Sequence, residues 1–254
     1  MNFELPFVPV RDKKPRQKAM TMVIDKGLTS IEATGIACDC AEYVDFIKIG
    51  FGTSLITPNL KEKVEIYKEA GITPYFGGTL FELFAARNMF NEYQEFLGKY
   101  NIELAEVSDG TMDMEHSQKL AYIKELKKNF TVISEVGSKD ASVYYTPEEW
   151  IQQMQAEFAA GSVKVITEAR ESGTIGIFNK DGSPNMELIN FISNNIAIDT
   201  IMWEAPLKAQ QAMFINLFGC DVNLGNIATN EIIALESLRM GLRGDTFYKI
   251  LPKN

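Results

Sequence analysis

The segment Leu104-Ala105-Glu106-Val107-Ser108-Asp109-Gly110 is a short apolar run that ends in a glutamate and then breaks into a turn. The same pattern recurs in Val132-Ile133-Ser134-Glu135-Val136-Gly137, Val165-Ile166-Thr167-Glu168-Ala169-Arg170 and Ile201-Met202-Trp203-Glu204-Ala205-Pro206. The four glutamates lie 29, 33 and 36 residues apart. These spacings match one strand, one helix and two loops, so the repeat predicts strands that alternate with helices.

The glutamates also indicate what gathers at the strand ends. A carboxylate at the end of a buried strand costs free energy unless it meets a cation, a hydrogen-bond donor or a ligand. Four of them in this rhythm predict a barrel of parallel strands whose carboxyl ends meet at a charged mouth. Folds of this kind carry their chemistry at that end.

Eight strand candidates can be found, with helical patterns between them. The strands are Met20–Asp25, Phe46–Gly50, Thr73–Gly77, the four runs that end in the glutamates above, and Asp221–Gly225. Helices are predicted over Leu60–Glu69, Glu82–Tyr100, Ser117–Lys128, Thr146–Ala160, Ala209–Phe218 and Asn230–Met240. Parallel pairing with right-handed crossovers follows from this alternation.

An open doubly wound sheet would carry a glycine-rich fingerprint after its first strand, and Asp25-Lys26-Gly27-Leu28 is not one. The sequence therefore predicts an α/β fold, a single (β/α)8 TIM barrel with a parallel eight-stranded sheet. Its 254 residues fit one such barrel of about 250 residues, and no linker divides them. One domain is expected over residues 1–254, with residues 1–19 as a short N-terminal extension.

Composition excludes several classes of protein. The net charge of −9 argues against a nucleic-acid binder, which needs a basic stripe. We expect no membrane association, because the start lacks signal-peptide features and no apolar run reaches about 18 residues. The three cysteines, Cys38, Cys40 and Cys220, are odd in number and indicate a cytoplasmic protein with reduced thiols. Cys38 and Cys40 are interpreted as ordinary helix residues.

Oxygen ligands and cations alternate at the predicted strand ends, and histidine is missing there. The only histidine, His116, falls near a helix start, so a Ser-His-Asp triad or a histidine-rich zinc site is not expected. Carboxylates without histidine or thiolate suit a hard cation, most simply Mg²⁺. The alternative is that the glutamates pair with neighbouring lysines and arginines in a purely structural charge layer.

The cations at the strand ends suit an anionic substrate. Arginine grips phosphate or carboxylate with two hydrogen bonds, whereas lysine acts as a point charge or proton carrier. Loops after the last two strands of a barrel often bind phosphate through backbone N–H groups. The candidate substrate- and phosphate-binding residues are Lys26, Lys48, Thr79, Arg170, Lys208, Asn223, Gly225 and Asn226.

These motifs together resemble the phosphosulfolactate synthase family, from about Thr21 to Phe247. The segments that carry the resemblance are 22–27, 45–54, 77–82, Glu135-Val136-Gly137-Ser138-Lys139-Asp140, Glu168-Ala169-Arg170-Glu171-Ser172-Gly173, Glu204-Ala205-Pro206-Leu207-Lys208 and Asn223-Leu224-Gly225-Asn226-Ile227. The chain departs from the family pattern at Phe51, where tryptophan is expected, and at Ser138, where a second lysine is common.

The resemblance implies a (β/α)8 barrel that adds sulfite to phosphoenolpyruvate with Mg²⁺, giving 2-phospho-3-sulfolactate, a coenzyme M precursor. Attack by sulfite makes an enediolate, which a divalent cation stabilises and which must then be protonated. Lys139 is the predicted proton donor, with anion binding as its rival role. Lys48 and Arg170 are predicted to hold phosphate or sulfite. The metal candidates are Glu106, Asp109, Glu135 and Glu168.

Two other functions are compatible with the residues. One is an aldolase-like barrel with Lys48 or Lys139 as a Schiff-base lysine, which needs a depressed pKa that neighbouring carboxylates oppose. The other is a non-catalytic, stress-related barrel of the same family. A scaffold has no physical need for so many charges at strand ends. The sequence is also compatible with a homo-oligomer and does not fix its size.

Overall fold

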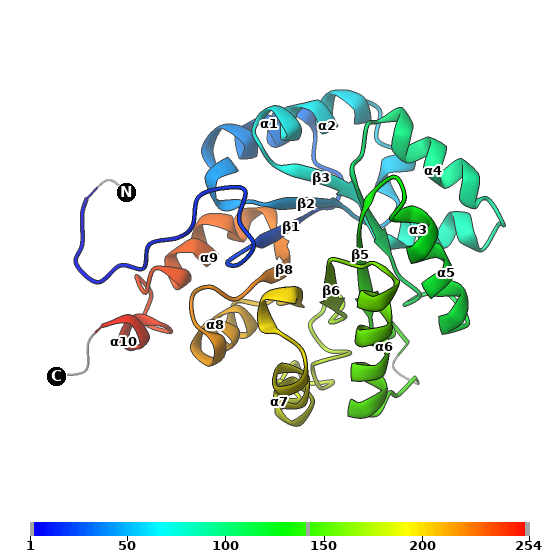
Figure 1. Cartoon of the computed structure of the whole chain (residues 1–254). Coiled ribbons are helices and arrows are strands. Elements are labelled where there is room, and N and C mark those ends of the chain that lie inside the picture. Colours follow the sequence, from blue (N-terminus) through cyan, green and yellow to red (C-terminus); the bar gives the residue numbers. More distant parts are fainter. Residues whose placement is uncertain (1–2, 141–142, 252–254) are drawn as a thin grey trace.

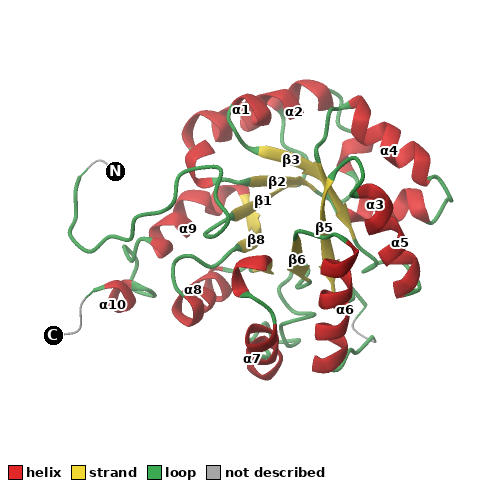
Figure 2. Ribbon diagram, viewed as in Figure 1, coloured by secondary structure: helices red, strands yellow, loops and turns green. Residues whose placement is uncertain are grey.

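The computed structural model describes residues 3–140 and 143–251, and the ends of the expected single domain, residues 1–2 and 252–254, lie outside that part. In the described residues, eight short strands form one sheet. The strands lie around a common centre, with helices outside them (Figures 1 and 2). The strands are β1 (Thr21–Asp25), β2 (Phe46–Ile49), β3 (Thr73–Phe76), β4 (Leu104–Val107), β5 (Thr131–Val136), β6 (Lys164–Thr167), β7 (Ile201–Glu204) and β8 (Leu224–Ala228).

All of the paired strands run parallel, in the order β3-β2-β1-β8-β7-β6-β5-β4. The register places Ile24 beside Lys48 and Lys48 beside Tyr75, so the strand ends on this side lie level. Strands β3 and β4 end the hydrogen-bonded order and lie next to each other. Because consecutive strands neighbour one another all the way round, the predicted (β/α)8 barrel is confirmed.

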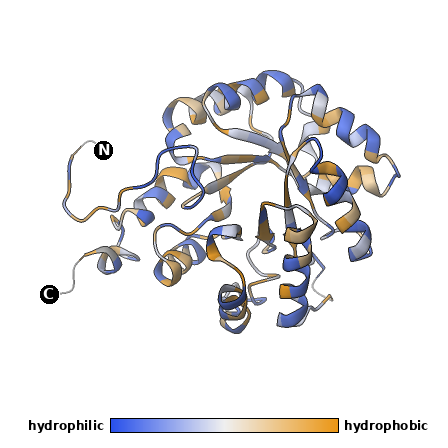
Figure 3. Cartoon of the chain, viewed as in Figure 1, coloured by the Kyte–Doolittle hydropathy of each residue, from blue (hydrophilic) through white to orange (hydrophobic). Residues whose placement is uncertain are grey.

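The helices that follow the strands cover the outside of the barrel. They are α1 (Ser30–Asp39), α2 (Leu60–Glu69), α3 (Gly78–Ala85), α4 (Phe90–Lys99), α5 (His116–Leu126), α6 (Pro147–Ala160), α7 (Met186–Asn195), α8 (Lys208–Phe218) and α9 (Ile232–Arg239). The short helix α10 (Phe247–Ile250) lies apart from the sheet (Figure 1). Hydrophilic colour covers much of these helices in Figure 3, whereas the strands are mostly white to orange. The apolar core therefore lies between the sheet and the inner faces of the helices.

Two sequence expectations about these elements were wrong. The helix predicted over Glu82–Tyr100 is two helices, because Asn88 adopts a positive φ of 56° that interrupts the helical path between α3 and α4. The last strand was placed at Asp221–Gly225, but β8 begins at Leu224. The residues before it serve as its entry, where the Asp221 carbonyl accepts the Ala19 N–H at 2.7 Å.

The chain before β1 is fastened across the amino-terminal end of the barrel. Asp45, which is 5% exposed, accepts hydrogen bonds from Arg16 Nε at 2.7 Å and from the Thr21 N–H at 2.8 Å. Arg11 adds an ion pair to Glu236, a residue of α9. No helix in the described part of the chain is long and apolar enough to span a membrane.

We predict that Asp45→Ala lowers the free energy of unfolding by about 3–5 kcal/mol, because it leaves the Arg16 guanidinium and the Thr21 N–H without their buried partner. Chemical denaturation followed by circular dichroism measures this. Lys18→Ala is the control, since it breaks an exposed ion pair to Asp221 and should change stability little. Equal losses of stability in the two variants would contradict the conclusion that Asp45 fastens the chain before β1 to the barrel.

Candidate active site

A cavity of about 630 Å³ opens at the carboxyl ends of the strands. Its charged walls come from different strands: Lys48 from β2, Glu135 from β5, and Glu204 from β7. Loop residues complete the lining after the strands end. The full set is Ile24, Lys48, Gly50, Phe51, Thr79, Thr111, Glu135, Lys139, Glu168, Arg170, Glu171, Ser172, Glu204 and Asn226.

Lys48 is the cation at the centre of the cavity floor. Its Nζ lies 2.9 Å from Glu106, 3.3 Å from Glu135 and 3.9 Å from Glu204. Burial by itself lowers the pKa of Lys48, but the three carboxylates outweigh it and hold that pKa well above its usual value. Lys48 is therefore held in its charged form and ties β4, β5 and β7 to its own strand, β2.

Lys139 lies in the loop that follows β5. Its Nζ donates to Glu135 Oε1 at 2.8 Å and lies 3.3 Å from Glu168 Oε2. Burial lowers the pKa of Lys139, and the two glutamates more than reverse this and raise it. Lys139 is therefore held in its protonated form at the edge of the cavity.

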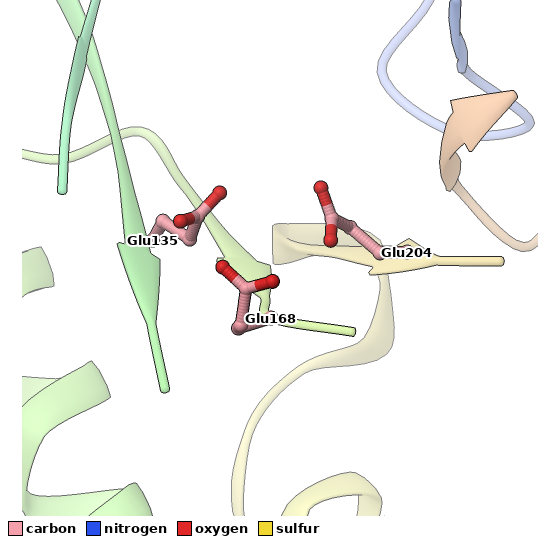
Figure 4. A group of neighbouring side chains, drawn as sticks. All are labelled: Glu135, Glu168 and Glu204. Carbon is pink, nitrogen blue, oxygen red and sulfur yellow. The ribbon is translucent and has the colours of Figure 1, made fainter. Parts of the chain in front are cut away.

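Three glutamates face one another beside these lysines. Figure 4 shows the carboxylates of Glu135, Glu168 and Glu204 converging from neighbouring strands, and one oxygen of each lies within 4.8 Å of the others. Burial and the charge of Glu135 raise the pKa of Glu168 well above its usual value. Burial raises the pKa of Glu204 to about 7, while Lys139 and Lys48 keep that of Glu135 low. If all three glutamates were ionised, the cluster would carry more negative charge than Lys48 and Lys139 neutralise, and the raised pKa values of Glu168 and Glu204 reflect this.

The donor set fits a hard divalent cation. All three carboxylates are 3% exposed or less, and Glu168 Oε2 has no hydrogen-bond partner among the described groups, Lys139 being only an ion-pair neighbour. A buried carboxylate oxygen without a donor is costly, and an all-oxygen site without histidine or thiolate is what Mg²⁺ prefers. Among the described residues this is the one group of acidic, histidine and cysteine side chains with such spacing.

The other two residues proposed from the sequence as metal ligands have different partners. Glu106 Oε1 accepts the Gly78 N–H at 2.6 Å and faces Lys48, so it braces the cavity floor. Asp109 accepts a hydrogen bond from Lys119 at 2.8 Å, outside the cavity lining. Glu204 stood among the strand-end glutamates but was not named as a ligand. Only the fold shows that β7 lies between β6 and β8, and this position brings the Glu204 carboxylate close to those of Glu135 and Glu168.

Two polar side chains in the cavity lack protein partners. Arg170 is exposed, adopts a positive φ of 52°, and makes no ion pair within the described chain. Asn226 is 6% exposed, and its Oδ1 has no hydrogen-bond partner there. Thr79 lines the same wall from the first turn of α3. The Arg170 guanidinium can therefore bind an anionic ligand, whereas the Asn226 Oδ1 accepts and calls for a donor or a cation.

Four residues predicted to bind substrate lie away from the cavity lining. Lys26 pairs with Glu171 at the rim, and Lys208 pairs with Asp245 at 2.7 Å on the surface. Asn223 is buried at the entry to β8, where it binds the Met20 N–H and two backbone carbonyls. Gly225 packs inside the barrel, where a Cβ would lie 2.8 Å from Met22 and 3.0 Å from Met202.

Sequence reasoning missed several residues that shape the site. Glu82 receives the Ser108 hydroxyl and, at 2.8 Å, the Thr111 N–H, so α3 fixes the loop after β4. Its signal was weak, because an acidic residue inside a predicted helix usually lies on the surface. Phe51 and Thr111 also line the cavity. Phe51 was noted only as a departure from a family pattern.

Comparison with known proteins places this site in a family. The family model described as (2R)-phospho-3-sulfolactate synthase (ComA) matches residues 9–245. Phosphosulfolactate synthase of Bacillus subtilis (strain 168) is 42% identical over 244 residues, 95% of this chain and 97% of the relative. The Methanothermobacter thermautotrophicus protein of that name is 40% identical over 248 residues, 95% of this chain and 96% of the relative.

Among solved structures, a 3-hexulose-6-phosphate synthase is similar with a TM-score of 0.55, covering 87% of this chain and 98% of that one. At 16% identity this likeness shows the fold alone. In enzymes with this barrel fold the active site lies at the carboxyl ends of the strands, where this chain has its charged cavity. Within this fold class, the chain belongs to the phosphosulfolactate synthase family. The resemblance seen in the sequence motifs is confirmed.

Gly78→Ala tests how the cavity floor is supported. A Cβ there would lie 2.2 Å from Ser108 Oγ and 2.7 Å from Glu106 Oε1, so these side chains must shift, and Glu106 is the partner of Lys48. We expect stability to fall by about 1–3 kcal/mol from overpacking, with loss of activity. Gly98→Ala on α4 meets nothing within 4 Å and should be neutral or slightly stabilising in thermal unfolding. A fully stable and active Gly78→Ala protein would refute this account.

Proposed function

We propose that this protein catalyses the addition of sulfite to phosphoenolpyruvate, giving 2-phospho-3-sulfolactate. The observation that carries the proposal is the position of protonated Lys139 beside Glu135 and Glu168, in a cavity that also presents the unpaired Arg170. Membership of the phosphosulfolactate synthase family supports the same reaction. We infer that the protein is a carbon–sulfur lyase acting in the direction of addition.

The charges of the cavity support an added cation. Glu106, Glu135, Glu168 and Glu204 are four carboxylates beside three cations, Lys48, Lys139 and Arg170, so full ionisation would leave one negative charge in excess before any substrate enters. Phosphoenolpyruvate and sulfite are both anions, so this excess would repel them. Glu135, Glu168 and Glu204 would hold a hard divalent cation such as Mg²⁺, which when bound acts as a Lewis acid that stabilises negative charge on substrate oxygens.

The residues of the chain divide the remaining work. The sulfur lone pair of sulfite attacks the methylene carbon of phosphoenolpyruvate, a C–S bond forms, and the double-bond electrons move into the carboxylate. Arg170, Asn226 and Thr79 line the wall of the cavity and would hold the anionic groups. Lys139 then donates its proton to the carbon that bears the phosphate, which completes the product.

The raised pKa values weigh against a Schiff-base mechanism. That chemistry needs a neutral amine. Burial lowers the pKa values of Lys48 and Lys139, but the neighbouring carboxylates outweigh burial and raise both pKa values. A non-catalytic scaffold is disfavoured because, within the described residues, Arg170 makes no ion pair and the Asn226 Oδ1 accepts no hydrogen bond, although both line the cavity. Cytoplasmic location, a coenzyme M pathway and homo-oligomer formation stay predictions.

The reaction and the metal are tested together. Incubation with phosphoenolpyruvate, sulfite and Mg²⁺ should yield the adduct in mass spectrometry, and EDTA should abolish it until Mg²⁺ is restored. Glu204→Gln should weaken Mg²⁺ binding in calorimetry, because it removes one buried carboxylate. Glu171→Gln at the rim is the matched control and should bind Mg²⁺ normally. Full turnover by a metal-stripped sample would overturn the metal assignment.

Proton donation by Lys139 is distinguished from anion binding by two variants. Lys139→Ala should reduce kcat by roughly 10²–10⁴-fold with little change in phosphoenolpyruvate affinity, because the lost interaction belongs to the transition state. Lys139→Arg should fail as well, since the longer, planar guanidinium cannot deliver a proton from the point that the compact Lys139 ammonium occupies. An active Lys139→Arg enzyme would make Lys139 an anion binder and Lys48 the next candidate acid.

A further inference from the structure

Lys119 is a buried cation that does not reach the cavity. It lies on α5, its side chain is 0% exposed, and it is absent from the cavity lining. Its Nζ makes three close contacts: 2.8 Å to Asp109 Oδ1, 2.6 Å to the Glu135 carbonyl oxygen, and 2.8 Å to Glu157 Oε1. An ammonium group has three donors, so each contact uses one of them.

The contact with Glu135 replaces a missing strand partner. The register between β4 and β5 ends with Val107 opposite Ser134. Glu135 is the next residue of β5, and its carbonyl oxygen lies beyond that ladder. A buried carbonyl without a donor costs free energy, and the Lys119 ammonium supplies the donor. The backbone from which the Glu135 carboxylate projects is therefore held by α5.

The contact between Lys119 and Asp109 is connected to Lys139 through the neighbouring residue Gly110. Asp109 lies in the loop after β4, and the carbonyl of the next residue, Gly110, accepts the Lys139 N–H at 2.9 Å. The Lys139 side chain also packs across Gly110, where a Cβ would lie 3.2 Å from Lys139 Nζ. Lys119 thus fixes the backbones on both sides of the Lys139–Glu135 ion pair.

The far side of Lys119 is closed by α6. Glu157 is 0% exposed, and its Oε1 also faces His116 Nε2 at 3.3 Å. Asp109, Glu157 and the Glu135 carbonyl each take one N–H of the ammonium, so Lys119 has no free donor for a substrate. Its effect on chemistry must therefore pass through Glu135 and Lys139.

We propose that Lys119 is a positioning residue for the reaction. It holds the Lys139 ammonium and the Glu135 carboxylate in the correct position relative to each other. It does so by holding the end of β5 directly and the loop after β4 through Asp109. This inference rests on the proposed function, because it assigns Lys119 a part in proton delivery by Lys139.

The first test compares two equally buried lysines. Lys119→Met should lower kcat about 100-fold, the loss expected from a displacement of about 1 Å, while KM for phosphoenolpyruvate changes little. Lys63→Met is the control: Lys63 is also 0% exposed and binds the Leu28 carbonyl and Asp25, each at 2.9 Å, on the other side of the barrel. It should lose stability but keep kcat, when both are assayed below their melting temperatures. Equal kcat losses would overturn the proposal.

The second test asks whether Lys119 acts through Lys139. In a Lys139→Ala background, Lys119→Met should lower kcat far less than in wild type, because the group it positions is already gone. Full additivity of the two losses would overturn the proposal. If Lys119→Met does not fold, Asp109→Ala takes its place. It breaks only the link to the loop and should give the same non-additivity.

The third test does not depend on turnover. Hydrogen exchange at the Lys139 amide, which donates to Gly110, should speed up in Lys119→Met and in Asp109→Ala but not in Lys63→Met. Unchanged protection would overturn the proposal. If the wild-type protein forms no sulfite adduct, the proposed function fails, whereas this measurement still decides whether Lys119 holds the loop.

Discussion

The structure depends on a layer of buried charge at the carboxyl end of the barrel. Lys48 on β2 faces carboxylates from β4, β5 and β7, and none of these groups could be buried alone. Each therefore requires the others to be in place, so the strands must close around a common centre. The apolar core stabilises the fold generally, while this layer fixes which strand ends meet and at what height.

The same layer creates the chemistry. A set of carboxylates that its lysines do not fully neutralise raises the pKa values of Glu168 and Glu204, chiefly because both are buried. Excess negative charge in a cavity suits a divalent cation, and the cation in turn suits anionic substrates. Under the proposed function, a bound cation would relieve this crowding of like charges. Helices α3 and α5 support the layer from outside, through Glu82 and Lys119.

Much of the fold could be predicted because its signals are local. Apolar runs ending in glutamate located β4 to β7, since a strand and its terminal carboxylate are adjacent in sequence. The break at Asn88 was missed because helical periodicity continues across it, and only the backbone shows the positive φ. The start of β8 was misplaced because Asp221 and Asn223 look like strand residues until their tertiary partners are seen.

The sequence by itself determined the repeating strand–helix unit, the family and the kinds of charge at the strand ends. It could do so because periodicity and motifs are properties of neighbouring residues. Only the tertiary structure decided which charges meet: Glu204 joins Glu135 and Glu168, whereas Asp109 turns to Lys119. The reason is physical. Ion pairing and metal binding depend on distances of a few ångströms between residues far apart in the chain, and barrel closure sets those distances.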